Sequence, residues 1–133
     1  MIVVDASLVV ELFLRGPLAT PIKEAMETHD GELIAPHLLD LEVLSAFRGL
    51  AASQGIDIHR SGEILSELAA LPAERYSHTN LIKRIWELRH NFTVYDATYI
   101  ALAEATDSIL FTCDAKLRRG HRARVRVFAY SIA

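Results

Sequence analysis

Short apolar runs that alternate with longer, helix-like segments constrain the fold of this chain more than any other feature of its sequence. Ile2–Val4 and Leu33–Ala35 are too short to be helices, and each precedes a segment in which apolar residues recur at helical spacing. Strands of this kind are buried on both faces, as in parallel sheets whose connections are helices. The pattern therefore predicts an α/β fold, in which helices cover both faces of a parallel sheet.

The remaining segments continue this alternation. We expect helices at Ala6–Leu14, from Thr20-Pro21 to a turn at Asp30-Gly31, at Pro36–Ser53, at Ile58–Leu71 and from about Asn80, and strands at Glu74–Ser77 and Val125–Phe128. The helix from Ile58 should be capped by Asp57, and its apolar stripe is Ile58, Ile64, Leu65, Leu68 and Leu71. Because no repeat or linker interrupts the series, a single domain over residues 1–133 is predicted.

The stretch Val94–Asp114 joins a helix and a strand to two acids. It reads as a helix rich in small residues, a turn at Thr106–Ser108 and a buried strand that stops near Asp114, before a short basic helix at Ala115–Arg119. In open parallel sheets, binding sites form beyond the carboxyl ends of the strands. Asp5 and Asp114 are expected at two such ends.

Composition is that of an ordinary globular protein, with 51% hydrophobic and 23% charged residues. No apolar run approaches the roughly 18 residues of a membrane span, and no basic region precedes Ile2–Val4, so we expect no secretory signal. Cys113 is the only cysteine, which excludes an intramolecular disulfide and fits a reducing, cytoplasmic environment.

Charge is distributed unevenly along the chain. The net charge is −3, yet 6 of the 14 basic residues follow Asp114, where no acid occurs; residues 1–115 carry 8 basic and 17 acidic residues, or −9. The basic residues of this segment are Lys116, Arg118, Arg119, Arg122, Arg124 and Arg126. They form either a footprint for a phosphate backbone or an ordinary solvated surface, and charge alone does not decide between these.

Glu42 lies on the side of its predicted helix that packs inward. The residues three and four positions away from it are Leu38, Leu39, Ser45 and Ala46. A carboxylate on such a face needs a partner, because desolvating it costs several kcal/mol. Asp40, two residues earlier, is expected to point elsewhere and to be solvated.

Asp96 has two interpretations. Its helical neighbours Tyr99, Ile100 and Ala103 belong to an apolar face, so its carboxylate could point inward. It also completes the S/T-x-x-D pattern of a capping box with Thr93, and in isolation this cap is the commoner use. One carboxylate oxygen could cap while the other serves a site.

Asp5 and Asp114 could each be an ordinary helix N-cap, but simple capping does not predict the whole set of four acids. Clustered carboxylates raise one another's pKa unless a cation neutralises them. Oxygen ligands without Cys or His favour Mg²⁺ or Mn²⁺ over zinc. The six histidines lack zinc-site spacing and no phosphate-binding loop is present. Trp86, Tyr95 and Tyr99 are interpreted as core or interface residues.

With these acids placed, the chain resembles the PIN-domain ribonucleases, and among them the VapC toxins of type II toxin–antitoxin systems. The motifs that carry the resemblance are I-V-V-D-A-S-L-V-V-E-L, L-L-D-L-E-V-L-S-A-F, Y-D-A-T-Y-I-A-L-A-E and L-F-T-C-D-A-K-L, in family order over nearly the whole length. Any one motif is weak evidence, but the combination is specific.

The resemblance implies a three-layer α/β/α sandwich with an acidic pocket that binds Mg²⁺ or Mn²⁺. By this match, Asp5, Glu42, Asp96 and Asp114 are the catalytic, metal-holding acids, and Ser7 and Thr112 are hydroxyls that support the pocket by hydrogen bonding. Members of the family are endoribonucleases that a cognate VapB antitoxin holds inactive, and they commonly form homodimers. We expect the same of this chain.

The resulting hypothesis is metal-dependent hydrolysis of RNA, with Lys116, Arg118 and Arg119 contacting the RNA backbone. One alternative is a phosphoacceptor receiver module, which expects an acidic pair after the first strand and a lysine at the end of the last. Here Asp5 stands alone and Val125–Phe128 contains no lysine. A second alternative is a catalytically silent RNA-binding scaffold, against which the complete set of acids argues.

Overall fold

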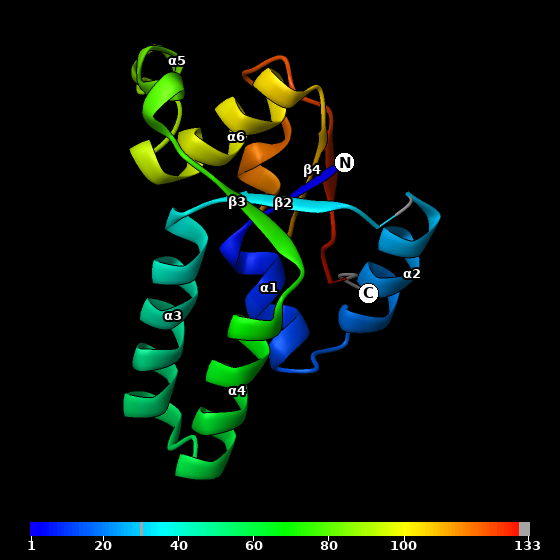
Figure 1. The fold of residues 1–133 in the computed structure, drawn as a ribbon, viewed down its shortest axis with the longest axis vertical. Helices are drawn as coiled ribbons and strands as arrows, with labels where there is room; N and C mark the ends of the chain where they lie inside the picture. The colour runs from blue at the N-terminus through cyan, green and yellow to red at the C-terminus, as the bar shows by residue number, and fades with distance from the viewer. Residues whose placement is uncertain (30, 131–133) are drawn as a thin grey trace.

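A parallel five-stranded sheet forms the centre of the molecule (Figure 1). The computed structural model describes residues 1–29 and 31–130. The strands are β1 (Ile2–Val4), β2 (Leu33–Pro36), β3 (Ala73–Tyr76), β4 (Ile109–Thr112) and β5 (Val125–Val127), and their order across the sheet is β3-β2-β1-β4-β5. All described strand pairs are parallel, as the alternation of strands and helices predicts.

Helices cover the sheet on both sides, which makes the fold a three-layer α/β/α sandwich. The helices are α1 (Ala6–Phe13), α2 (Ala19–Thr28), α3 (Leu38–Gln54), α4 (Ile58–Ala70), α5 (Ile82–Glu87) and α6 (Val94–Thr106), with 3₁₀ turns η1 (Thr79–Leu81) and η2 (Ala115–Arg118). Figure 1 shows α5 and α6 on one side of the sheet and α1 to α4 on the other. The predicted fold class is confirmed.

The central strands are buried on both faces because β1 lies between β2 and β4. Ile2 is in register with Leu33 on one side and with Ile109 on the other. Every residue of β1 is inaccessible to solvent, which explains why its sequence is uninterrupted Ile-Val-Val rather than alternating. The strand order also differs from the 2-1-3-4-5 order of receiver-like folds, so the receiver alternative is not supported.

Several predicted boundaries and faces were wrong. Pro36 ends β2 and does not open the following helix. The pairing of β2 with β1 ends at Ile34, so no residue of β1 lies opposite Pro36 to accept the N–H that proline lacks, and Pro36 can take the last position of the strand beside Tyr76 of β3. Ile58 is 89% exposed and Leu65 is also exposed, so only Ile64 and Leu68 of the predicted stripe are buried. The first two predicted helices are present as α1 and α2, and α2 ends at Thr28. Asp30 of the turn predicted to follow α2 lies outside the described residues.

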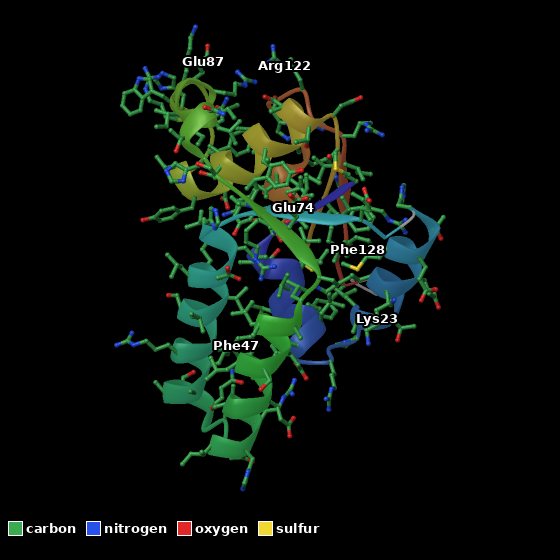
Figure 2. The ribbon with its side chains drawn as sticks, in the orientation of Figure 1. Lys23, Phe47, Glu74, Glu87, Arg122 and Phe128 are labelled. Atoms are coloured by element: carbon green, nitrogen blue, oxygen red, sulfur yellow. The ribbon has the colours of Figure 1, made fainter. Side chains whose placement is uncertain are left out.

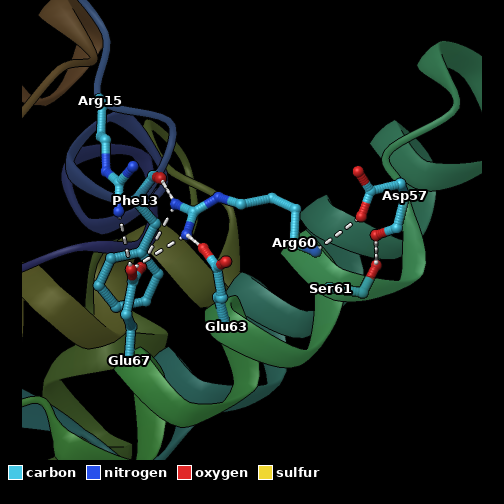
Figure 3. Close-up of polar contacts among 7 residues, drawn as sticks. All are labelled: Phe13, Arg15, Asp57, Arg60, Ser61, Glu63 and Glu67. Atoms are coloured by element: carbon cyan, nitrogen blue, oxygen red, sulfur yellow. Dashed lines mark hydrogen bonds and ion pairs between the residues drawn. The ribbon is translucent and has the colours of Figure 1, made fainter.

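The pair of helices α3 and α4 extends away from the sheet (Figure 1), and polar contacts of the first turns of α4, near the connection between the two helices, hold α4 against the end of α1 (Figure 3). Asp57 caps α4 by accepting the Arg60 N–H at 2.9 Å, as predicted. The Arg60 guanidinium donates to Glu63 at 2.9 Å and to Glu67 at 3.0 Å, and also to the carbonyl oxygen of Phe13. Since Phe13 ends α1, this arginine joins α4 to the helix that follows β1. None of the described helices has both the length and the apolar character needed to cross a membrane.

Candidate metal centre

Two of the predicted acids are helix caps at the carboxyl ends of adjacent strands. Asp5 follows β1 and caps α1, accepting the Leu8 N–H on Oδ1 at 3.0 Å. Asp114 follows β4 and caps η2, accepting the Lys116 N–H at 2.9 Å. Because β1 and β4 are paired in parallel, both carboxylates are delivered to one edge of the sheet.

Asp5 is held by two hydroxyl groups in addition to its capping bond. Ser7 donates its hydroxyl hydrogen to Asp5 Oδ1 at 2.7 Å, and Thr112 donates to Asp5 Oδ2. The two hydroxyl oxygens lie 3.3 Å apart. Thr112 in turn accepts the Asp114 N–H at 3.0 Å, and Ser7 accepts the Cys113 N–H at 3.0 Å. The end of β4 and the start of α1 are therefore fixed together around the Asp5 carboxylate.

Glu42 reaches the site from α3 and meets a buried phenol on α6. Tyr99 donates its hydroxyl hydrogen to Glu42 Oε1 at 2.6 Å, across 57 positions of sequence. Only 1% of Tyr99 is exposed, whereas Glu42 is half-buried. Burial raises the pKa of Tyr99, and the charges of Glu42, Asp5 and Asp96 raise it further. The phenol group thus contacts one of the predicted acids directly, and the charges of two others act on it.

Asp96 occupies the first turn of α6, so the structure shows how much of the predicted capping box is formed. Thr93 caps the helix by accepting the Asp96 N–H at 3.1 Å. Within the described part of the chain, the Thr93 N–H donates no hydrogen bond to the Asp96 carboxylate, so only one of the two bonds of a capping box is formed. Burial raises the pKa of Asp96 and the charge of Asp114 adds to this, while Lys116 opposes it.

Few cationic side chains compensate the negative charges of the four predicted acids. Burial raises the pKa of Asp5 from 3.8 to about 6, against the hydrogen bonds that it accepts, and Asp96 contributes to the rise. The pKa of Glu42 is raised by burial and by Asp96. Of the four, only Asp114 forms an ion pair among the described residues, with Lys116 at 3.8 Å. A divalent cation would supply the missing charge.

Two other partly buried acids of the chain, Asp40 and Glu104, are each paired with an arginine. Asp40 pairs with Arg75 at 2.7 Å, so the prediction that Asp40 is simply solvated was wrong. Glu104 accepts two hydrogen bonds from Arg84, at 2.7 and 3.0 Å. Although burial opposes it, these bonds lower the pKa of Glu104 below its ordinary value. Asp5, Glu42 and Asp96 have no such arginine partner among the described residues, and this separates them from Asp40 and Glu104.

The carboxylates are electrostatically coupled but are not gathered into a coordination sphere. Across residues 1–29 and 31–130, no three His, Cys, Asp or Glu side chains are arranged to hold a metal ion. Uncompensated carboxylates repel one another, and in this structure Glu42 is turned towards Tyr99 and Asp114 towards the Lys116 N–H. The donor chemistry nevertheless fits a hard divalent cation, because every candidate ligand is a carboxylate oxygen.

The family described as PIN domain matches residues 2–122 of this chain. The chain belongs to the PIN-domain family. Within it, the chain groups with the VapC proteins. It is 42% identical over 116 residues to ribonuclease VapC1 of Mycobacterium tuberculosis, covering 86% of each chain. It is 35% identical over 132 residues to ribonuclease VapC12 of the same species, covering 97% of this chain and all of that one.

A solved structure supports the fold of this PIN domain independently. The crystal structure of PAE2754 from Pyrobaculum aerophilum superimposes with a TM-score of 0.68 at 21% identity, covering 88% of this chain and 83% of that one. At this level of identity the likeness concerns the fold alone.

The basic segment of the PIN domain divides into two groups. Arg122 pairs with Glu104 at 3.8 Å beside α6, where Figure 2 shows it, and Arg124 pairs with Asp107 at 3.7 Å. Arg126 lies over the ring of Phe128 at 4.9 Å. The exposed residues that follow Asp114 directly on η2 and just after it are Lys116, Arg118 and Arg119. Of this second group, Lys116 pairs with one of the predicted acids, Asp114, at 3.8 Å.

Proposed function

We propose that this PIN domain is a metal-dependent endoribonuclease that hydrolyses RNA phosphodiester bonds as the toxin of a VapBC pair. The observation that carries the proposal is the set of predicted acids Asp5, Glu42, Asp96 and Asp114. Burial raises the pKa values of Asp5, Glu42 and Asp96, which have no arginine partner in the described part of the chain, whereas Asp40 and Glu104 are each paired with an arginine. The family membership and the names of the VapC relatives support the same reaction.

In this proposal Mg²⁺ or Mn²⁺ is held by Asp5, Glu42, Asp96 and Asp114. A bound divalent cation supplies Lewis-acid stabilisation to a phosphoryl group and makes water a better nucleophile at neutral pH. Ser7 and Thr112 keep the Asp5 carboxylate in one orientation, since each donates to a different oxygen of it. Lys116, Arg118 and Arg119 contact the RNA backbone, where cationic side chains neutralise phosphates.

The direct test is cleavage of purified RNA by the purified protein. We expect cleavage with Mg²⁺ or Mn²⁺ and none with excess EDTA, together with growth arrest on expression that a VapB-type antitoxin relieves. A short reading frame just upstream that encodes a DNA-binding fold is the natural candidate for this antitoxin. RNA binding without cleavage under any divalent cation would instead support a silent scaffold.

We further propose that the protein forms a homodimer through an apolar groove between the start of α3 and the helices α5 and α6. This groove is lined by His37, Leu38, Leu41, His78, Ile82, Ile85, Trp86, Val94, Tyr95 and Thr98. Leu41, Trp86 and Tyr95 are each more than half exposed, so Trp86 and Tyr95 are not core residues. The lining contains no Asp, Glu, Lys or Arg, and the Arg89 guanidinium lies over the Trp86 ring at 4.3 Å, so the surfaces that two copies would bury against each other are mainly apolar.

Placing a charge in the groove should separate the dimer. We expect Trp86→Glu to weaken self-association at least roughly 30-fold, since a buried interface tryptophan typically contributes 2 kcal/mol or more. Sedimentation or light scattering over a concentration series measures this. Ile58→Glu is the matched control, because Ile58 is 89% exposed on α4 and does not line the groove. A wild-type protein that stays monomeric at high concentration contradicts the proposal.

A further inference from the structure

Tyr99 connects the two helices that supply acids to the candidate metal centre from opposite sides of the sheet. It lies one turn after Asp96 on α6, and its hydroxyl donates to Glu42 Oε1 on α3 at 2.6 Å. This is the only hydrogen bond to the Glu42 carboxylate within the described residues, and no ion pair reaches it. The position of Glu42 Oε1 is therefore determined by one phenol group.

The surroundings of this hydroxyl are unusual for a core tyrosine. The side chain is almost fully buried, yet its hydroxyl donates to the Glu42 carboxylate and not to a backbone carbonyl. The charges that act on it come, in decreasing order, from Glu42, Asp5 and Asp96. A phenylalanine would fill the same apolar volume, so packing alone does not require the hydroxyl at this position.

Glutamate has three rotatable side-chain bonds, and an exposed or half-buried glutamate samples many rotamers. A hydrogen bond to one carboxylate oxygen restricts these rotamers and leaves the lone pairs of the other oxygen available. Groups that hold metal ligands in this way from outside the coordination sphere contribute to metal affinity through orientation. Glu42 Oε1 is held in this manner, and Oε2 accepts no hydrogen bond in the described structure.

We propose that Tyr99 is a positioning residue of the metal centre, which acts by holding the Glu42 carboxylate for a divalent cation. The inference rests on the proposed function, since it assigns a role at the same site. It assigns no contact between Tyr99 and the RNA or the reacting phosphate. The chain itself offers a matched control, because Tyr130 also donates its hydroxyl to a buried glutamate, Glu11, at 2.6 and 2.8 Å.

The test is the affinity of the purified protein for Mn²⁺, measured by calorimetry or by the electron paramagnetic resonance of free Mn²⁺. We expect Tyr99→Phe to weaken binding roughly tenfold, the lower end of the effect of removing an outer hydrogen bond to a metal ligand. Tyr130→Phe should bind as wild type. In RNA cleavage, Tyr99→Phe should need more Mn²⁺ but recover its rate at saturation, whereas a distorted fold would lower the rate at every concentration.

A double-mutant cycle shows whether Tyr99 acts through Glu42. In a Glu42→Gln background, which itself weakens Mn²⁺ binding, adding Tyr99→Phe should cause little further loss. Equal losses in both backgrounds, or wild-type affinity for Tyr99→Phe, would overturn the inference. Should Tyr99→Phe fail to fold, a Glu42→Gln protein that binds Mn²⁺ as wild type would overturn it equally. Absence of Mn²⁺ binding by the wild-type protein would overturn the proposed function itself.

Discussion

Replacing Asp5 or Asp96 with Asn is expected to reduce metal-dependent RNA cleavage at least about 100-fold while the protein remains folded. Each substitution removes a negative charge from the cluster and keeps the shape of the side chain. Loss of one ligand charge removes part of a Lewis-acid effect of several kcal/mol, and each 1.36 kcal/mol corresponds to about a tenfold change in rate. Cleavage of a defined RNA under single-turnover conditions, with circular dichroism for the fold, measures both quantities.

The control for this experiment is Asp57→Asn, because Asp57 and Asp5 have the same local role. Both residues cap a helix with a carboxylate oxygen, Asp57 at the Arg60 N–H and Asp5 at the Leu8 N–H. Asn caps helices about as well as Asp. If Asp5 were only a cap, Asp5→Asn would be as harmless as Asp57→Asn. Cleavage by both Asp5→Asn and Asp96→Asn at the wild-type rate would show that the proposed site is wrong.

The sheet could be predicted from the sequence because its central strands have a one-dimensional signature. Ile2–Val4 and Leu33–Pro36 are buried on both faces, so burial appears directly as an uninterrupted apolar run. The exposed side of α4 could not be predicted in this way. Helical spacing assigns Ile58 and Leu65 to the apolar stripe of α4, but both are exposed. The reason is that α3 and α4 extend beyond the sheet (Figure 1), and the local sequence does not indicate how far the core reaches along a helix.

The acids of the candidate site could be chosen from the sequence, but their partners could not. Asp5 and Asp114 follow strands, a position that a local pattern reveals. The bond from Tyr99 to Glu42 and the pair of Arg75 with Asp40 join residues 57 and 35 positions apart. Such pairs depend on how helices pack, so Asp40 was wrongly expected to be solvated.

The sequence also does not determine which aromatic residues of α6 are buried. Tyr99 and Tyr95 stand one helical turn apart in the same small-residue segment, yet Tyr99 is buried at the acids and Tyr95 is exposed beside the apolar groove. Helical spacing assigns the two residues to neighbouring positions and does not say which one faces the sheet. The hydroxyl of a buried tyrosine usually has a hydrogen-bond acceptor, and here the acceptor is Glu42, on another helix.

Without a divalent cation, Asp5 should make the protein less stable as the pH rises from about 4 to about 7. Burial raises the pKa of Asp5 from 3.8 to about 6. Between these values the folded protein keeps a proton that the unfolded chain has released. Because the native state then binds more protons than the unfolded state, the free energy of unfolding falls with rising pH. A shift of this size corresponds to roughly 3 kcal/mol once the pH exceeds the higher value.

Urea denaturation in EDTA at several pH values, on the wild-type protein and on Asp5→Asn, isolates this contribution. Other groups also titrate; Glu104, whose pKa is lowered by Arg84 despite its burial, favours the folded state as the pH rises. The difference between the two proteins removes such shared contributions. Asp5→Asn should be as stable as wild type near pH 4 and more stable at pH 7. Identical pH dependence in the two proteins would contradict the raised pKa.

A cation should reverse this penalty, because it binds the ionised carboxylates of the folded state. Saturating Mg²⁺ or Mn²⁺ is expected to stabilise the wild-type protein at pH 7, by an amount that grows with the ratio of cation concentration to Kd. Asp5→Asn should gain much less. If Asp5 served only as the cap of α1, Asn would cap the helix equally well and would not carry the buried negative charge that destabilises the metal-free protein at pH 7. An acid that destabilises the metal-free protein and is compensated by a cation is instead explained by function.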